Sequence, residues 1–283
     1  MSMDAERRGR RRLPVLGELE APALLGLAAP IQARQGIHLP ASEDLSPRAH
    51  ALLSAVREAL VSAADRPEGV TQVFSLDHLD AEERAELWDM LGEGEVSIVV
   101  QGTSRYEIEE TALPGVFRVR TRRQDGDSLH LEVGTIPAVV VVAAHHGTSP
   151  EMALEDPPPP GLMNAQPLLA ELKHRSATAE IGVENHVVSL SLLPMNDADS
   201  VYLARILGAG PIKAESRGYG TCRVTATSRR GIWSVQHFNA MDVLVLDTLE
   251  IGTVPTALLA AAMDLEDSGK RLSELLDDVQ DAS

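Results

Sequence analysis

The sequence contains nearly the same phrase twice, and this repeat constrains the fold more than any other feature. Residues 131–137, LEVGTIP, return 118 positions later as LEIGTVP at 249–255, and residues 91–94, LGEG, return as LGAG at 207–210, a shift of 116. Single residues repeat at the shift of 116: Gly102 and Gly218, Thr111 and Thr227, Gly115 and Gly231, and Val119 and Val235. Glycines, prolines and apolar positions specify turns and core faces, so the matches indicate one backbone built twice, with a net two-residue insertion in the second copy.

Composition places the chain among globular proteins and narrows its partners. It has 283 residues, of which 44% are hydrophobic and only 3% aromatic, so we expect cores of Leu, Val, Ile and Ala. A formal net charge of −17 repels phosphate backbones, so we predict no nucleic-acid partner. No apolar run reaches the roughly 20 residues that span a bilayer, so we predict no membrane insertion. A single cysteine, Cys222, suits a reducing compartment, and we expect a cytoplasmic protein.

Shifts in composition divide the chain into four segments. Residues 1–45 are rich in Arg, Pro and Ala and have no counterpart in the repeat, so we expect a partly disordered N-terminal arm. The first repeat unit covers 46–146, and a Pro-rich linker with four consecutive prolines covers 147–163. The second unit covers 164–283.

The order of patterns is the same in the two units. Each opens with a helical pattern and a short apolar strand, and a second helix then begins with acidic residues, at 80–83 and at 196–199. Alternation follows, with strands expected at 96–100, 105–111, 116–121 and 129–133 and again at 212–216, 221–227, 232–238 and 243–251. Sequential strands with short connections usually pair antiparallel. The predicted fold class is therefore α+β: a tandem repeat of two similar units, each a mainly antiparallel sheet of about four strands packed on helices.

The C-terminal stretch has an amphipathic pattern. Leu272, Leu275, Leu276 and Val279 recur at helical spacing, with Asp277 among them. We expect a C-terminal amphipathic helix that docks on the second unit, the alternative being a helix that binds a partner.

Motifs that carry chemistry do not occur in the chain. None of the nine histidines has metal-ligand spacing, and the side chains of the adjacent His145 and His146 diverge. No nucleophile elbow, Walker loop or strand-linked GxGxxG occurs either. We therefore predict no catalytic set, no metal site and no cofactor, and a protein that is not an enzyme.

Cys222 admits two interpretations. One thiol cannot hold an iron–sulfur cluster alone, and strand alternation places it on a sheet face, with Tyr106 at the same position in the first copy. It is either a residue that fills space on that face or a thiol that contacts a partner.

The strongest candidate for a binding surface is the part of the second copy that differs from the first. Two turns of the second copy carry arginine, aromatic and amide groups where the first copy has other polar residues, and Arg and aromatic side chains are enriched at protein-binding hot spots. The alternative is that they decorate exposed turns. Together with residues of the adjoining strands, the predicted partner-binding set is Arg217, Tyr219, Cys222, Arg223, Trp233, His237, Phe238 and Asn239.

Several blocks of sequence resemble a known family. Residues 91–97 and 107–116 are similar to the first conserved block of the HupH/HoxQ/HyaF hydrogenase expression/formation proteins, and residues 207–211, 216–224, 233–239 and 246–251 to the second. The chain departs from the family pattern at Thr221, where asparagine is usual, at Ile232, where the family has a second tryptophan, and at 113–117, where it reads LPGVF.

The resemblance implies a role in the maturation of [NiFe]-hydrogenase. It implies a non-enzymatic maturation factor, or chaperone, that binds the iron–sulfur small-subunit precursor before export, alongside a thioredoxin-like maturation companion. The alternative is direct participation in iron–sulfur cluster assembly or redox protection through Cys222. The acidic character of the chain could complement a basic leader on such a precursor.

Overall fold

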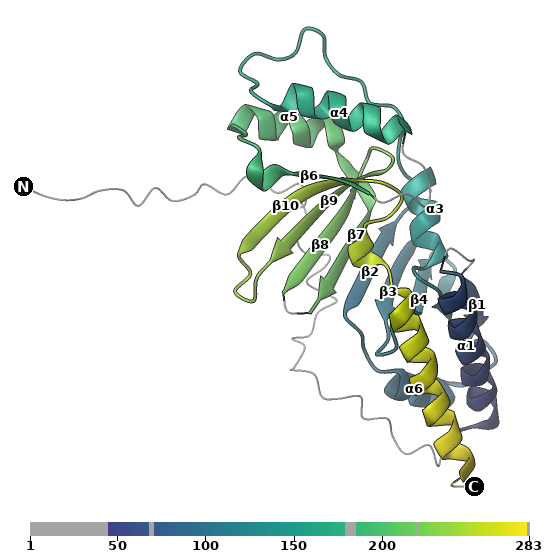
Figure 1. The fold of residues 1–283 in the computed structure, drawn as a ribbon. Coiled ribbons are helices and arrows are strands. Elements are labelled where there is room, and N and C mark those ends of the chain that lie inside the picture. Colours follow the sequence, from purple (N-terminus) through teal and green to yellow (C-terminus); the bar gives the residue numbers. More distant parts are fainter. Residues whose placement is uncertain (1–44, 68–70, 179–184, 219, 282–283) are drawn as a thin grey trace, which may run out of the picture.

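The computed structural model describes residues 45–67, 71–178, 185–218 and 220–281 (Figure 1). The predicted N-terminal arm and Tyr219 therefore lie outside the described residues, apart from Leu45.

The described part of the first half forms three helices and five strands. Capping explains where its second helix begins, because the Asp80 carboxylate accepts from the backbone N–H of Glu83 while the Glu83 carboxylate accepts from the N–H of Asp80. The elements are α1 (Pro47–Asp65), β1 (Gln72–Ser75), α2 (Ala81–Leu91), β2 (Val96–Gln101), β3 (Arg105–Glu110), β4 (Val116–Arg123), β5 (Gly126–Val133) and α3 (Ala138–His146).

The second half repeats this order with three changes, of which the first is an added 3-10 turn between its first strand and its second helix. A 3-10 turn, η4, stands where the first half has α3, and a long helix, α6, follows it. The elements are α4 (Ala165–Thr178), β6 (His186–Ser189), the 3-10 turn η3 (Leu190–Leu192), α5 (Asp197–Leu207), β7 (Ala209–Arg217), β8 (Thr221–Thr227), β9 (Ile232–Phe238), β10 (Leu244–Ile251), η4 (Thr256–Leu258) and α6 (Ala262–Asp281).

The strands form one continuous antiparallel sheet of ten, in the order β1-β5-β4-β3-β2-β7-β8-β9-β10-β6. The α+β class with antiparallel pairing is confirmed, but the expectation of two four-stranded sheets is wrong. Each half contributes five strands because β1 and β6 pair with β5 and β10, and the halves join where β2 pairs with β7 from Val96↔Ser216 to Val100↔Ile212. This pairing covers two strands that would otherwise be open edges.

Helices cover the two faces of the sheet differently. On one face, α1, α2 and α6 pack over the outer strands of the first half, and α4 and α5 pack over those of the second (Figure 1). On the opposite face, α3 and η4 cover the centre of the sheet around Ile98, Val224 and Trp233. The two faces separate because neighbouring residues of a strand point to opposite sides.

After its last strand, each half crosses over to the other half. The expectation that the C-terminal helix docks on the second unit is wrong, because α6 lies beside α1 and buries Leu265 and Leu272 in the core of the first half (Figure 1). In the other direction, Met152 of the predicted linker is buried against α4 and α5, and Ser149 forms a bridge with Arg229. The segment 147–163 is therefore packed in part, and the halves interlock through these crossings.

No helix in the described ranges combines the length and the apolar character needed to cross a membrane.

Candidate partner-binding surface

The predicted binding residues do not converge on one site. Alternation along β7, β8 and β9 places Arg217, Arg223 and Phe238 on the face that carries α4 and α5. It places Cys222, Trp233 and His237 on the other face. Asn239 lies in the turn that joins β9 to β10. The sequence therefore predicted the right region but not its division between two faces.

An arginine cluster lies at the open end of β7, β8 and β9. The Glu215 carboxylate accepts from the Nε–H groups of both Arg217 and Arg223, the second at 3.3 Å. Arg223 also donates through Nη2 to Asp242 Oδ1 at 3.2 Å, and its guanidinium carbon lies 4.3 Å from the centroid of the Phe238 ring. A planar guanidinium held by two carboxylates and an aromatic ring is pre-organised for contact with a partner. Sequence reasoning missed Glu215, although its register opposite Arg223 could have indicated the pair.

The first half has a different cluster at the equivalent place. There the Glu107 carboxylate accepts from Arg105 Nε at 3.1 Å and from Arg122 Nε at 3.0 Å, and Arg122 donates to Asp127 at 3.1 Å. No aromatic ring takes part in this set, because Arg122 stands where the second half has Phe238. The aromatic contact thus belongs to the second half.

The β9–β10 turn is held by one side chain. Asn239 Oδ1 accepts from the backbone N–H groups of Met241 and Val243 at 2.9 and 3.0 Å, and the N–H of Asn239 donates to the carbonyl of Val243 at 3.0 Å. The two-residue insertion of the second copy lies in this hairpin: Phe238 pairs with Leu244 across five intervening residues, whereas Arg122 pairs with Asp127 across four, and a register shift between Leu244 and Leu246 adds one more.

Trp233 is a core residue. Its side chain is buried in the central cluster, and its indole N–H donates to the carbonyl of Gly252 at 3.4 Å. The residue at the same place in the first half, Phe117, is also fully buried. A side chain in this position cannot reach a partner, which corrects the prediction that Trp233 belongs to the binding set.

Cys222 is half-buried on the face opposite the arginine cluster. Its Sγ lies 4.0 Å from His237 Nε2. Burial, and then the nearby charge of Glu250, raise the pKa of the Cys222 thiol to about 11. The thiolate is the reactive form of cysteine, so at neutral pH this group is a weak nucleophile.

Within the described residues, no three His, Cys, Asp or Glu side chains lie close enough together to hold a metal ion. His145 and His146 lie with their ring centroids 4.7 Å apart at the end of α3, and no third ligand joins them among the described residues.

Comparison with known proteins places the chain in a family. The HupH hydrogenase expression protein C-terminal conserved region matches it twice, over residues 47–155 and 162–279. The chain belongs to this HupH family. The two matches coincide with the two halves of the ten-stranded sheet, and each includes the segment through which its half crosses to the other.

Curated members of the HupH family align over most of the chain. It is 38% identical over 229 residues to the hydrogenase expression/formation protein HupH of Rhizobium leguminosarum bv. viciae, covering 79% of each chain. It is 40% identical over 253 residues to the hydrogenase expression/formation protein HupQ of Azotobacter chroococcum mcd 1, covering 86% of each. A solved structure, the hydrogenase expression protein HupH from Thiobacillus denitrificans ATCC 25259, is 25% identical with a TM-score of 0.38 and covers 41% of this chain and 96% of that chain.

Proposed function

We propose that this protein is a maturation factor for [NiFe]-hydrogenase, without enzymatic activity of its own, that binds the iron–sulfur small-subunit precursor in the cytoplasm before export. It acts alongside a thioredoxin-like maturation companion. The observation that carries the proposal is membership of the HupH family across both halves of the chain, together with relatives named as hydrogenase expression/formation proteins.

The open end of the second half is the binding surface in this proposal. Arg217 and Arg223 share the Glu215 carboxylate, and Arg223 stacks on Phe238, so these side chains lose little conformational freedom when a partner docks. Arginine and aromatic residues in such settings dominate the free energy of many protein interfaces. The proposal also takes the two halves to be copies of one ancestral unit, of which the second has specialised.

The alternative role for Cys222, in cluster assembly or redox protection, has less support. A half-buried thiol with a pKa of about 11 lacks the electropositive, exposed setting of reactive cysteines. We therefore assign Cys222 to the sheet face rather than to chemistry.

Co-purification tests the proposal with a matched pair of variants. The full chain is recovered from cells that make a [NiFe]-hydrogenase, and the bound small-subunit precursor is quantified by mass spectrometry. Arg217→Ala should lower recovery at least about fivefold, since truncating a hot-spot arginine costs more than about 1 kcal/mol.

Arg105→Ala is the control. Arg105 pairs with Glu107, two residues away, as Arg217 pairs with Glu215, and the two arginine side chains are 36% and 34% exposed. It should leave recovery unchanged. Absence of any hydrogenase subunit from the wild-type preparation under gentle conditions overturns the proposal.

A further inference from the structure

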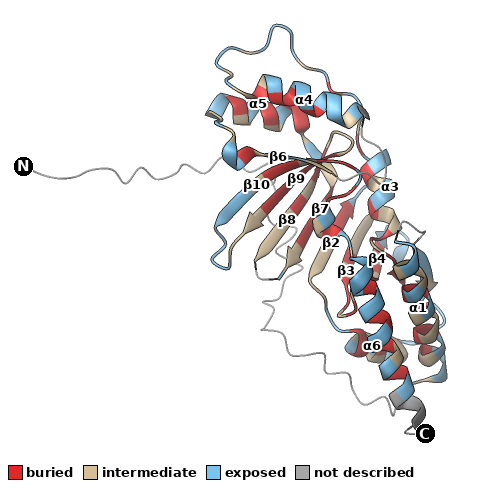
Figure 2. Cartoon of the chain, in the orientation of Figure 1, coloured by how far each residue is buried: buried red, intermediate tan, exposed pale blue. Residues whose placement is uncertain are grey.

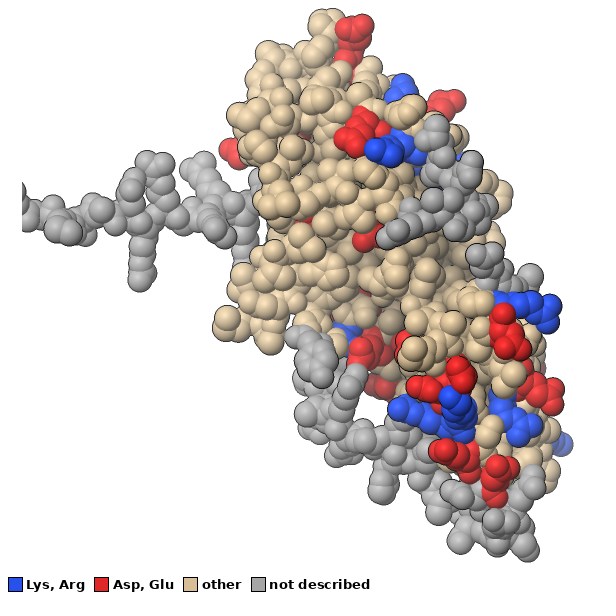
Figure 3. Space-filling model, viewed as in Figure 1, with Lys and Arg blue, Asp and Glu red and all other residues tan. Residues whose placement is uncertain are grey.

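The beginning of β10 and the turn before it expose an unusual apolar stretch. Five of the six residues 241–246 are apolar, and all six are exposed, from 38% for Leu244 and Leu246 to 57% for Val245 and 79% for Met241. Figure 2 shows the outer end of β10 in pale blue, next to an inner end that is buried. In Figure 3 the middle of the visible face is mostly tan, whereas charged side chains gather toward the upper and lower parts of the molecule. Contiguous exposed apolar residues usually mark an interaction site.

This stretch is also an open strand edge. β6 pairs with β10 only from Thr248 to Ile251, and beyond that point Ser191 Oγ accepts from the N–H of Asp247 at 2.8 Å. Among the described strands none pairs with the outer edge of Leu244–Leu246. At the same junction Ser189 Oγ and Asp247 Oδ1 are buried without a hydrogen-bond partner in the described structure. An edge of this kind is a template for another strand, and natural proteins normally protect it with charge, proline, a β-bulge or a cover. Here the register shift between Leu244 and Leu246 is a bulge of this kind, but the side chains around it are exposed and apolar.

The first half lacks this feature. Its equivalent strand, β5, begins with Gly126, Asp127 and Ser128 after a two-residue turn, so the outer end of β5 is open as well but polar. The insertion and the apolar side chains occur together in the second half only. The exposed apolar end of β10 is therefore a specialised surface of the second half and not a requirement of the fold.

We propose that the free edge of β10 accepts an extended aliphatic segment of a partner protein, which adds to the sheet as an eleventh strand. Backbone N–H and C=O groups of the added strand would pair with the open edge, and its side chains would cover Leu244, which lies opposite Phe238, on one face and Leu246, which lies opposite His237, on the other. The identity of the partner as the hydrogenase small-subunit precursor rests on the proposed function. The geometry of the site is independent of the proposed function.

The occupant is a neutral or basic segment rather than a second copy of this chain. A second β10 would have only the few residues before Asp247 to pair with, because β6 and η3 occupy the edge beyond it. Two copies would also bring together net charges of −17 each. A flexible segment can turn away from the edge where it meets the last residue of β6, Ser189. A basic segment is also attracted by the net negative charge of this chain.

A synthetic peptide tests the inference without the precursor. The probe alternates Val and Thr over eight residues, has two lysines at each end and has blocked termini. Bound to the full chain, it should slow amide hydrogen exchange of residues 243–246 about tenfold or more and leave Gln72–Ser75 unchanged. The same peptide with alternate N-methyl groups, which cannot complete a strand ladder, should not bind. Equal binding of both peptides, or protection elsewhere, overturns the inference.

Variants of the two edge strands give a second test of peptide binding. Val245→Lys places a charge on the exposed edge and should weaken peptide binding about tenfold. Val73→Lys is the matched control, because Val73 is 59% exposed on β1, the edge strand at the other end of the sheet, and it should bind as wild type.

The two proposals fail in different ways. If the wild type binds the probe but not the precursor, the proposed function fails and the edge site stands. If Val245→Lys binds both precursor and probe as wild type does, the edge site fails and the proposed function stands. A concentration-dependent dimer in sedimentation that Val245→Lys abolishes would overturn the assignment to a partner segment.

Discussion

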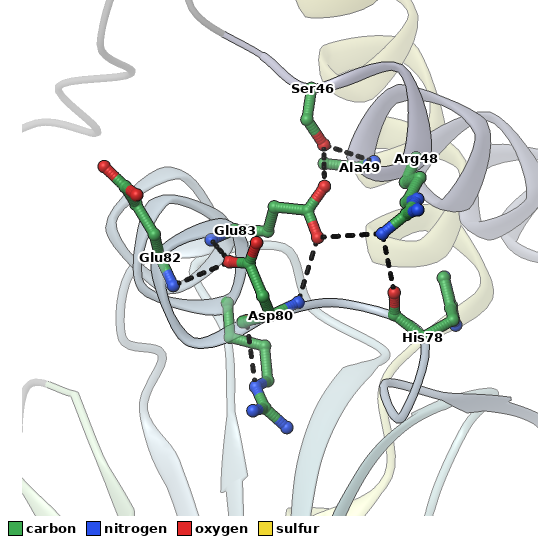
Figure 4. Close-up of polar contacts among 8 residues, drawn as sticks. Ser46, Arg48, Ala49, His78, Asp80, Glu82 and Glu83 are labelled. Carbon is green, nitrogen blue, oxygen red and sulfur yellow. Dashed lines mark hydrogen bonds and ion pairs between the residues drawn. The ribbon is translucent and has the colours of Figure 1, made fainter.

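The two halves of the molecule solve the same capping problem with different side chains. Glu83 and Asp199 occupy equivalent positions, 116 residues apart, at the third residue of α2 and of α5, and each forms a capping box at its own helix. In the first half, Glu83 also accepts from the hydroxyl of Ser46 at 2.7 Å, and Ser46 in turn caps α1 by accepting from the N–H of Ala49 (Figure 4).

In the second half the carboxylate caps the neighbouring helix directly. Asp199 Oδ1 accepts from the backbone N–H groups of Met163, Asn164 and Ala165 at 2.8 to 3.0 Å, where α4 begins, and Oδ2 accepts from that of Asn196 at 3.1 Å. Burial alone would raise the pKa of Asp199, but these backbone donors outweigh burial and lower it. An acidic residue at this position therefore connects two helices in each half. In the first half the connection runs through the Ser46 hydroxyl, and in the second half the carboxylate contacts the neighbouring helix directly.

Asp199→Ala should give the largest loss of stability. It leaves three N–H groups at the start of α4 and one of Asn196 without their acceptor at a fully buried position, and we expect the free energy of unfolding to fall by about 4 kcal/mol. Glu83→Ala should cost clearly less, because Ser46 still caps α1. Urea denaturation of both variants measures the difference, and equal losses would show that the two clasps are equivalent.

Gly115→Ala should be the next most damaging change, and it tests the crossing of α6. Gly115 has φ +85°, and a Cβ there would lie 2.0 Å from Leu265 Cδ2 on α6. Its second-half equivalent, Gly231, has φ +68°, and a Cβ there would meet only the Gly252 carbonyl oxygen at 3.3 Å. We expect a loss of about 3 kcal/mol for Gly115→Ala and about 1 kcal/mol for Gly231→Ala.

A double-mutant cycle checks the cause of that difference. In a Leu265→Ala background the clash disappears, so Gly115→Ala should then cost about 1 kcal/mol, as Gly231→Ala does. An unchanged cost would mean that α6 does not press on this turn.

Glu110→Gln tests a pH-dependent contribution to stability that the first half has and the second half lacks. Burial raises the pKa of Glu110 to about 7. The hydrogen bond from the Gly115 N–H lowers this pKa in part, whereas the charges of Glu95 and Asp264 help to raise it. The second half has Ala226 at this position. The folded state therefore holds a proton that the unfolded state releases above pH 4.5, so stability falls as the pH rises toward 7. The variant should be more stable than wild type by about 3 kcal/mol at pH 8 and equal to it near pH 4, as measured by urea denaturation across pH. A constant difference across pH would contradict the raised pKa.

The sequence predicted those parts of the fold that local patterns of residues encode. The strands expected at 221–227 and 232–238 lie at Thr221–Thr227 and Ile232–Phe238, because alternation and flanking glycines are local signals. The helix Ala138–His146 was missed because its side chains are almost uniformly apolar and show no helical period. The pairing of β2 with β7, the packing of α6 on α1 and the reach of Asp199 to α4 join residues distant in sequence, and no local pattern encodes them. For the candidate surface, divergence between the copies indicated the hairpins, but the apolar edge at 243–246 was hidden within an ordinary strand pattern.

Cys222→Ala should have the smallest effect, and it tests whether the second half uses its thiol. Tyr106 occupies the same place in the first half, so the fold does not require sulfur there. Because Cys222 is only partly buried, the variant should lose about 1 kcal/mol of stability or less. Hydrogenase maturation, followed as activity of the exported enzyme in cells that carry the variant, should remain at the wild-type level, since a thiol with a pKa of about 11 is protonated at neutral pH. Loss of maturation in the variant with normal protein levels would instead assign the thiol a chemical role, and the difference between the halves would then include chemistry as well as binding.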